Sequence, residues 1–259
     1  MSNSSSFLHD GLAVKVVGRY AAELLPLLQK YPVRILLPED SSAPELVIAY
    51  GGDGTLLGAE RDFPGVPKLP LRDKSHNPRC ERHSEEQCLE AFFGGAYACE
   101  TLGKLCVRSE DGQEQLALND IVLSRQFHPL GAIRCRIEKD GILLRPQVIA
   151  DCLVFSTPSG STGYFQSVTR GTFAEGLGLA YGNPMEGEAF QIFPANSRLE
   201  IKILRGPAFV QADNSPEVFK VLDGKRLTVQ AAPQPARVFG MEAFRCRECY
   251  LLRRNGIRQ

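Results

Sequence analysis

A short apolar segment that ends in three glycines around one carboxylate constrains this chain more than any other feature. Residues 46–49 read Leu-Val-Ile-Ala and lead, after one tyrosine, into Gly51-Gly52-Asp53-Gly54. Glycine has no Cβ, so such a loop lets backbone N–H groups close on an anion. Residues 56–61 are helical in character, which places the loop at a helix N-terminus, where anions are favoured. We therefore predict a strand–loop–helix unit that holds phosphate.

The glycine loop has a simpler interpretation as well. In an ordinary strand–turn–helix connection, Asp53 would only cap the helix. A four-residue motif of this kind arises often by chance. Beside a bound anion, Asp53 would instead be a base or a metal ligand. The rest of the chain has to decide between these interpretations.

The first third of the chain alternates between strand-like and helix-like segments, which is typical of a parallel sheet in an α/β domain. Pro26 should limit the first helix or lie in its first turn. Residues 62–84 are rich in proline and charge and are expected to form a long loop. The expected strands are 14–17, 33–37 and 46–49, and the expected helices are 21–29, 56–61 and 85–93.

From about residue 104 the pattern changes to short strands separated by turn signals, which predicts an all-β, β-sandwich-like second domain. Residues 168–187 are glycine-rich and should be irregular, and residues 241–252 have no partner in the pattern. We expect an α/β domain over 1–103 and a β domain over 104–235. The ten expected strands are 104–107, 115–118, 120–124, 133–138, 143–148, 152–156, 198–204, 208–211, 217–221 and 227–230.

Composition excludes some classes of function. The 259 residues carry 30 basic and 30 acidic side chains, so no net field draws the chain to nucleic acid or to an anionic membrane. No apolar run approaches the ~20 residues needed to span a bilayer. The start is polar and lacks the apolar core of a signal peptide. These features predict a cytoplasmic protein with neither nucleic-acid nor membrane partners.

Eight cysteines in a chain of this kind are expected to be reduced thiols. Two groups of them lie near other potential metal ligands. They could together form a zinc site, but they lack the paired CxxC spacing typical of one and also suit a polar loop, so we assign no metal ligand. The residues concerned are His76, Cys80, His83 and Cys88, and Cys246 with Cys249.

A second polar loop follows the strand at 152–156. Residues 157–163 read Thr-Pro-Ser-Gly-Ser-Thr-Gly and are followed by Tyr164. Their hydroxyl and N–H groups can bind a base edge or phosphate, and the tyrosine can stack on a flat ring. Asp151 can accept hydrogen bonds from ribose, as acidic residues do in dinucleotide sites. Upstream, Asn119-Asp120 adds an amide and a carboxylate. Taken alone, the loop would be an ordinary surface turn.

In their order and spacing, Gly51-Gly52-Asp53-Gly54, Leu118-Asn119-Asp120 and the loop at 157–164 resemble the motif set of the NAD kinases. The similarity spans about residues 12–235. The first motif alone is shared with diacylglycerol and sphingosine kinases, so the second loop is the discriminating one. The resemblance implies an α/β domain, a β-sandwich-like domain and a nucleotide cleft between them. It also implies that residues 236–259 return to the first domain.

The resemblance further implies ATP-dependent phosphorylation of the 2′-hydroxyl on the adenosine ribose of NAD, with Mg²⁺ or another divalent cation, by a homodimer or homotetramer. Asp53 would be the catalytic carboxylate and Gly52 and Gly54 would belong to the phosphate loop. The residues implied to bind NAD are Asn119, Asp120, Asp151, Thr162, Gly163, Tyr164 and Ser167.

The chain departs from the family pattern in two segments, 69–77 and 167–171, which marks it as a divergent member. Arg72, Lys74 and Arg170 lie there and could contact phosphates, although charges in such loops are commonly only solvated. Two other functions remain open. One is a kinase of lipids or sugars, which shares the first loop but has no need for the second. The other is a non-catalytic regulator that binds NAD.

Overall fold

The computed structural model describes residues 10–73, 80–125 and 131–254. The chain separates into two units, each with its own core. We call them the α/β unit (Met1–Leu102 with Ala236–Gln259) and the β unit (Gly103–Pro235). Among the described residues, no helix is long and apolar enough to cross a membrane.

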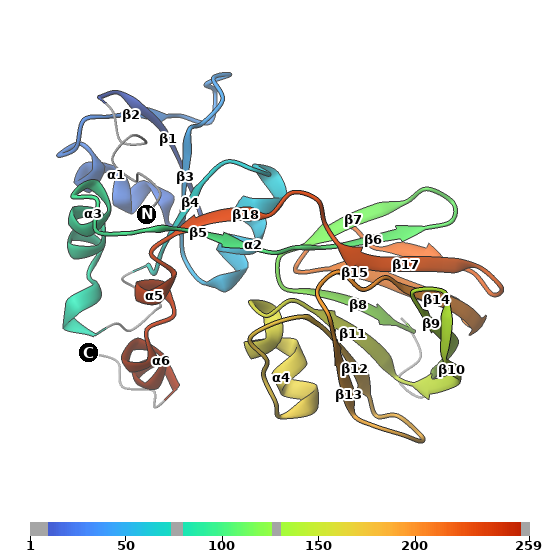
Figure 1. Ribbon diagram of the computed structural model, residues 1–259. Coiled ribbons are helices and arrows are strands. Elements are labelled where there is room, and N and C mark those ends of the chain that lie inside the picture. Colours follow the sequence, from blue (N-terminus) through green and yellow to red (C-terminus); the bar gives the residue numbers. More distant parts are fainter. Residues whose placement is uncertain (1–9, 74–79, 126–130, 255–259) are drawn as a thin grey trace. The chain divides into compact units, whose positions relative to one another are not determined.

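The α/β unit is built on one six-stranded sheet in the order β2-β1-β3-β4-β18-β5 (Figure 1). The first four of these strands are parallel, and β18 pairs parallel with β4 and antiparallel with β5. The strands are β1 (Leu12–Val17), β2 (Val33–Leu36), β3 (Leu46–Tyr50), β4 (Lys68–Leu71), β5 (Cys99–Leu102) and β18 (Ala236–Phe239). The helices are α1 (Ala21–Leu28), α2 (Asp53–Asp62), α3 (Glu85–Phe93), α5 (Met241–Phe244) and α6 (Arg247–Arg254), with a 3-10 turn, η2 (Glu81–His83).

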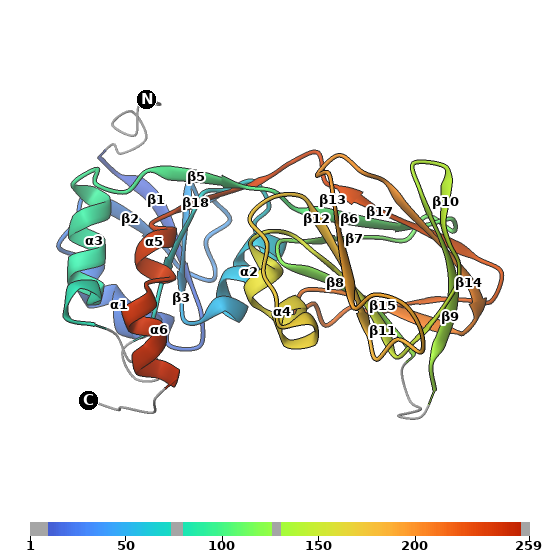
Figure 2. The same cartoon turned by 60° about the horizontal axis from the view of Figure 1, so that its bottom comes forward.

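Helices cover the sheet of the α/β unit on both sides. In both views α1 and α3 lie on one side of it and α2 lies on the other (Figures 1 and 2). Leu24 and Leu28 of α1 and Phe92 of α3 belong to the core formed with β1, β3 and β4. Every residue of β3 is buried, because both faces of that strand are covered. This explains its continuous apolar run.

Two expectations for the α/β unit were wrong. Pro26 lies inside α1 rather than in its first turn, because packing of Leu24 and Leu28 on the sheet stabilises the short helix. The expected loop at 62–84 contains strand β4, which was hidden by its proline and by Lys68. That lysine is fully buried and forms an ion pair with Glu60, so it reads as polar in the sequence but belongs to the interior.

In its described residues, the β unit consists of two six-stranded sheets, one α-helix and a 3-10 turn, η3 (Gly160–Thr162). The first sheet has the order β10-β9-β14-β17-β6-β7, and the second β13-β12-β11-β8-β15-β16. The strands of the first sheet are β6 (Leu105–Ser109), β7 (Glu114–Ala117), β9 (Ile133–Lys139), β10 (Ile142–Ala150), β14 (Leu199–Arg205) and β17 (Arg226–Ala231). Those of the second are β8 (Asp120–Ser124), β11 (Cys152–Ser156), β12 (Leu177–Gly182), β13 (Phe190–Phe193), β15 (Ala208–Ala212) and β16 (Phe219–Val221).

Strand β11 is buried on both faces. Its Leu153 and Phe155 join the large core to which both sheets contribute. Its Cys152 and Val154 lie instead under Phe165 of helix α4 (Tyr164–Thr169). The strand therefore has a core on either side, and it delivers the chain to the polar loop from a rigid support.

The segment at 168–187, expected to be irregular, contains strand β12. The strand was not predicted because glycine has a low strand propensity, but its glycines have a packing role. A Cβ placed on Gly178 would lie 2.5 Å from the ring of Phe173 and 2.8 Å from that of Phe165. Glycine in a strand often marks such a close approach.

Candidate active site

The predicted strand–loop–helix unit is present in the α/β unit, but the loop is shorter than expected: Gly51 and Gly52 connect β3 to α2, and Asp53 and Gly54 begin the helix. Gly52 is the N-cap residue of α2 and Asp53 is the first residue of the helix. The N–H of Gly51 donates to the carbonyl oxygen of Leu71 at 2.7 Å, which fixes the loop to β4. A Cβ on Gly51 would lie 2.3 Å from Oγ1 of Thr55, so no larger residue fits there. The loop and the N-terminus of α2 together form a setting that favours anions.

Asp53 is not the N-cap residue of its helix, because Gly52 occupies that position and Asp53 is the first residue inside the helix. Its carboxylate is half exposed and forms an ion pair with Arg72, with 3.0 Å between Oδ2 and Nη2. Arg72 itself is buried, at 8% exposure of its side chain. Its guanidinium lies 3.9 Å above the ring of Phe244 and donates to the carbonyl oxygen of the same residue at 3.4 Å. The buried guanidinium of Arg72 therefore holds the Asp53 carboxylate in place.

A second guanidinium lies near this carboxylate. Burial lowers the pKa of Arg245, and the charge of Asp53 acts in the opposite direction, while Arg72 lowers the pKa further. Arg245 follows α5, almost two hundred residues from Asp53 in the sequence, and nothing in its local sequence indicated this place. Two guanidiniums and a helix N-terminus beside one carboxylate can neutralise several phosphate charges.

The three basic residues of the divergent segments have different outcomes. Arg72 is buried and paired, so the interpretation of a merely solvated charge was wrong for it. Arg170 is exposed and ends α4 in a left-handed conformation. Lys74 lies outside the described residues.

In the β unit, the polar loop and the Asn119-Asp120 pair lie at the same end of two paired strands. Asp120 begins β8, and Ser156 ends β11 directly opposite it in the antiparallel pairing. The loop at 157–163 then folds onto the residues before β8. The Thr157 N–H donates to the Asn119 carbonyl at 2.9 Å, and the Thr157 hydroxyl donates to the Leu118 carbonyl at 2.7 Å. The two motifs thus form one structure.

Gly160 allows this close approach. A Cβ on it would lie 2.3 Å from the carbonyl oxygen of Asn119. Ser159 donates to the amide oxygen of Asn119 at 3.3 Å. Ser161 is buried, and its hydroxyl bonds the backbone of Phe173. The hydroxyls of Thr157 and Ser161, expected to face a ligand, therefore hold the loop in shape.

Asp213 organises the same end of the sheet and was not identified from the sequence. Its carboxylate accepts the backbone N–H groups of Leu118, Asn119 and Asp120 at 2.7, 2.9 and 2.9 Å. In the sequence it is an ordinary turn aspartate after a strand. Its contacts lie more than ninety residues away, so no local pattern could have indicated them.

Asp120 is a buried acid whose carboxylate can accept a further hydrogen bond. Among the described residues, its Oδ1 atom is buried without a hydrogen-bond partner. Burial raises its pKa to about 7, and the neighbouring charge of Asp213 raises it as well, while Ser156 and the N–H of Tyr164 favour the charged form. A buried acceptor without a donor is costly unless a ligand supplies one. This position is suited to a hydroxyl or amide of a bound ligand.

The raised pKa of Asp120 predicts a pH-dependent stability. The unfolded chain ionises this acid near 3.8 and the folded chain near 7, so its contribution to stability is lost as pH rises from about 4 to about 7. Because asparagine does not titrate, the melting temperature of Asp120→Asn should rise relative to the parent across this window and level off above it. Thermal melts across the window, with the exposed Asp62→Asn as control, check this. A difference that is independent of pH would contradict it.

Tyr164 and Asp151 lie near the loop in the same unit. The ring of Tyr164 is 45% exposed, and its hydroxyl lies 3.7 Å from Sγ of Cys152. Partial burial and the contact with Cys152 raise its pKa to about 12, so the hydroxyl is neutral. Asp151 is exposed and accepts from Asn183 at 2.8 Å. An exposed ring beside an exposed carboxylate can take an adenosine.

The remaining predicted residues line the start of α4. Thr162 and Gly163 are exposed, and Gly163 is the N-cap residue of the helix. The hydroxyl of Ser167 donates to the Tyr164 carbonyl at 2.7 Å and so serves the helix itself. In the β unit, the structure therefore brings the predicted residues Asn119, Asp120 and Tyr164 together. Asp53 belongs to the α/β unit. The nucleotide cleft expected between the units stays a prediction.

A hollow lies in the β unit, apart from the predicted site residues. It has a volume of about 430 Å³ and opens on the first sheet of the β unit. It contains none of the predicted site residues. Half of its lining residues are charged, namely Arg108, Glu110, Arg198, Glu200 and Arg226.

A glycine loop at a helix N-terminus, with a carboxylate and two guanidiniums, defines a phosphate-handling protein of the kinase class. The comparisons agree with this. No family model matches the chain. The NAD kinase of Bordetella avium is 28% identical over 236 residues, which cover 84% of this chain and 77% of that protein.

Solved structures share the fold. A yeast NADH kinase complexed with NADH superposes with a TM-score of 0.76 at 18% identity, over 96% of this chain and 88% of that one. An NAD kinase from Archaeoglobus fulgidus in complex with ATP has a TM-score of 0.73 at 20% identity, over 93% and 98%. In sequence and in fold, this chain is a divergent relative of the NAD kinases.

Proposed function

We propose that the protein is an NAD kinase, which transfers the γ-phosphate of ATP to the 2′-hydroxyl on the adenosine ribose of NAD. The observation that carries the proposal is the folding of loop 157–163 onto Asn119 and Asp120. In the part of the chain that the structure describes, this arrangement holds an acceptor without a hydrogen-bond partner, Oδ1 of Asp120, beside the partly exposed Tyr164. A kinase of lipids or sugars has no need for such a pocket. The relationship to NAD kinases over most of the chain supports the same function.

In the proposed reaction, the ribose 2′-oxygen attacks the γ-phosphorus in line as the bond from that phosphorus to the β–γ bridging oxygen breaks. Asp53 accepts the hydroxyl proton, and NADP and ADP leave. Arg72 holds the Asp53 carboxylate in place, and together with Arg245 it offsets the charge of the triphosphate. In phosphoryl transfer, such positioning and charge stabilisation supply most of the acceleration.

The donor set near Asp53 fits a divalent cation of the Mg²⁺ type. Such an ion keeps several waters and binds through one or two carboxylates and the substrate phosphates, and Asp53 offers one half-exposed carboxylate. When bound with ATP, the ion would neutralise the negative charge that develops in phosphoryl transfer. In this proposal Asp53 and the phosphate loop belong to the α/β unit, and the residues that would bind NAD belong to the β unit. We also propose a homodimer or homotetramer, which light scattering would test.

A direct assay tests the function. The purified chain is incubated with ATP, Mg²⁺ and NAD, and NADP is detected with an NADP-specific dehydrogenase. We expect ATP-dependent NADP formation. Parallel reactions with labelled ATP and either diacylglycerol or sphingosine should transfer no label. Binding of NAD without NADP formation, with Mn²⁺ as well as with Mg²⁺, would contradict the proposal and favour a non-catalytic regulator.

A further inference from the structure

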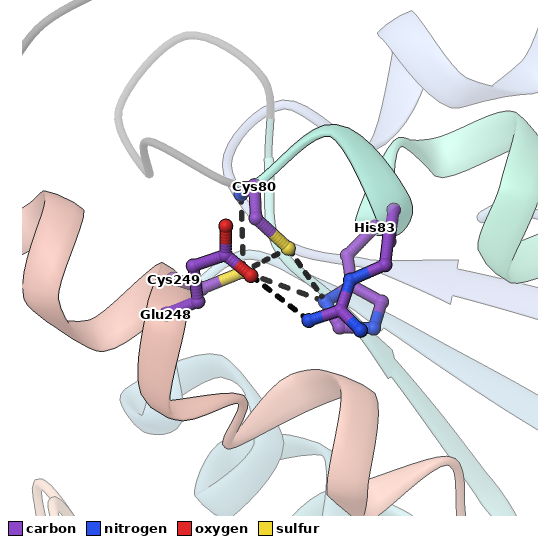
Figure 3. A network of polar contacts seen from close by, with 5 residues as sticks. Cys80, His83, Glu248 and Cys249 are labelled. Carbon is purple, nitrogen blue, oxygen red and sulfur yellow. Dashed lines mark hydrogen bonds and ion pairs between the residues drawn. The ribbon is translucent and has the colours of Figure 1, made fainter.

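Three thiols and one imidazole, from two distant segments of the chain, meet in the α/β unit. The ligand atoms of Cys80, His83, Cys246 and Cys249 all lie within 4.8 Å of one another. Figure 3 shows Cys80, His83 and Cys249 turned toward a common point. Cys88, which belonged to the same sequence group, lies instead in the hydrophobic core, and His76 lies outside the described residues.

The distances match a metal centre and not a disulfide. Sγ of Cys80 and Sγ of Cys249 are 3.5 Å apart, whereas a disulfide bond measures about 2.05 Å. Nδ1 of His83 lies 3.2 Å from the first sulfur and 3.5 Å from the second. With zinc–sulfur bonds of about 2.3 Å and zinc–nitrogen bonds of about 2.05 Å, tetrahedral ligands lie about 3.8 and 3.6 Å apart. These three contacts are slightly shorter than that, while Cys246 Sγ lies within 4.8 Å of the other ligand atoms, so a bound ion would need only small side-chain adjustments.

The backbone on each side forms a compact ligand turn. Cys80 and His83 are separated by two residues across the 3-10 turn η2. Cys246 and Cys249 have the same separation at the start of α6, where the N–H of Tyr250 donates to the Cys246 carbonyl at 2.9 Å. The paired spacing was present in the sequence after all, with histidine in place of one cysteine. Such pairs are typical of structural zinc sites.

Two further contacts tie the ligand turns together. The N–H of Cys80 donates to Sγ of Cys249 at 3.2 Å, and such bonds stabilise a charged thiolate and orient it toward a metal. Arg82 of one turn and Glu248 of the other form an ion pair at 2.9 Å. Cys80 and Cys249 are buried, and His83 and Cys246 are partly buried. The group is enclosed and preformed.

We propose that Cys80, His83, Cys246 and Cys249 bind one structural Zn²⁺ ion. Soft thiolates with an imidazole select zinc over Mg²⁺ or Ca²⁺. Four protein ligands leave no open position, so the ion has no direct catalytic role. It would fasten α6 to the segment before α3. Because Phe244, just before α6, contacts Arg72, the ion would also stabilise the support of Asp53. The proposal does not depend on the function proposed above.

Metal analysis of the full-length chain tests the site. The chain is expressed in zinc-supplemented medium, and its metals are measured by mass spectrometry. We expect about one zinc per chain, and below about a tenth in Cys80→Ser and in Cys246→Ser. Cys99→Ser is the matched control, because this exposed thiol lies in the same unit outside the cluster and should leave the zinc content unchanged.

A second measurement keeps the test decisive if the serine variants fail to fold. Cobalt(II) is exchanged into the parent protein, and its absorption spectrum is recorded. Tetrahedral coordination with three thiolates should give visible d–d bands and a strong thiolate-to-cobalt charge-transfer band, and added Zn²⁺ should remove both. A parent chain without zinc or a cobalt spectrum, or Ser variants that fold and keep full zinc, would overturn the proposal. So would a disulfide within the cluster in freshly purified protein.

Discussion

Asp53→Asn should lower kcat for NADP formation by about 10²–10⁴-fold, the range typical of a general base, while NAD still binds. Asparagine keeps the shape of the side chain and can still accept the hydrogen bond from Arg72, but it cannot take the proton of the ribose hydroxyl. The effect should fall on kcat and leave KM for NAD nearly unchanged, because the pocket of the β unit is untouched. Steady-state kinetics and calorimetric titration with NAD measure the two quantities.

Helix α2 provides the matched control for this variant. Asp62, its last residue, is exposed and pairs with the neighbouring Arg61 at 2.9 Å, so Asp62→Asn makes the same chemical change at the other end of the same helix. It should keep full activity. Equal melting temperatures of Asp53→Asn and the parent would exclude loss of folding as the cause. If Asp53→Asn binds NAD and turns over at the parental rate, Asp53 is not the base.

The sequence predicted elements well where one periodicity dominated. The bounds of β8 and β11 match the predicted strands, because each is an apolar run ended by polar residues. Prediction from the sequence failed where a contact with a distant residue outweighed the local pattern of apolar and polar residues. Strand β4 carries Lys68, whose ion pair with Glu60 allows it into the interior. Strand β18, also missed, becomes a sheet strand by pairing with β4 and β5.

The residues of the candidate site also fall into some that the sequence indicated and some that it did not. Asp53 and Asp120 stand in recognisable motifs, so their types and order indicated them. Asp213 and Arg245 contact or influence residues far away in the chain, and no local pattern marks them. The zinc ligands are an intermediate case. Each spacing of two residues was visible, but the pairing of Cys80 with Cys249 depends on the chain returning to the α/β unit.

The buried ion pair between Glu60 and Lys68 predicts the largest loss of stability. Glu60 of α2 and Lys68 of β4 are 4% and 0% exposed, and Lys68 also donates to the carbonyl oxygen of Phe63 at 2.5 Å. Removing one member deprives the other of its opposite charge in the interior, which costs about 3–5 kcal/mol. Lys68→Met and Glu60→Leu should each lower the free energy of unfolding by this amount, as measured by urea denaturation.

The double variant and a surface pair separate charge from packing. If the loss comes from the unpaired charge, Lys68→Met with Glu60→Leu should recover most of the stability, because two apolar side chains can replace a buried ion pair at little cost. Lys30 and Glu86 also pair, at 2.7 Å, but are 61% and 53% exposed, so Lys30→Met should leave the free energy of unfolding nearly unchanged. A double variant as unstable as the sum of the single ones would contradict this account. Since the pair fixes α2 on β4, the single variants should also disturb the Asp53–Arg72 contact, because those residues lie at the ends of the same two elements.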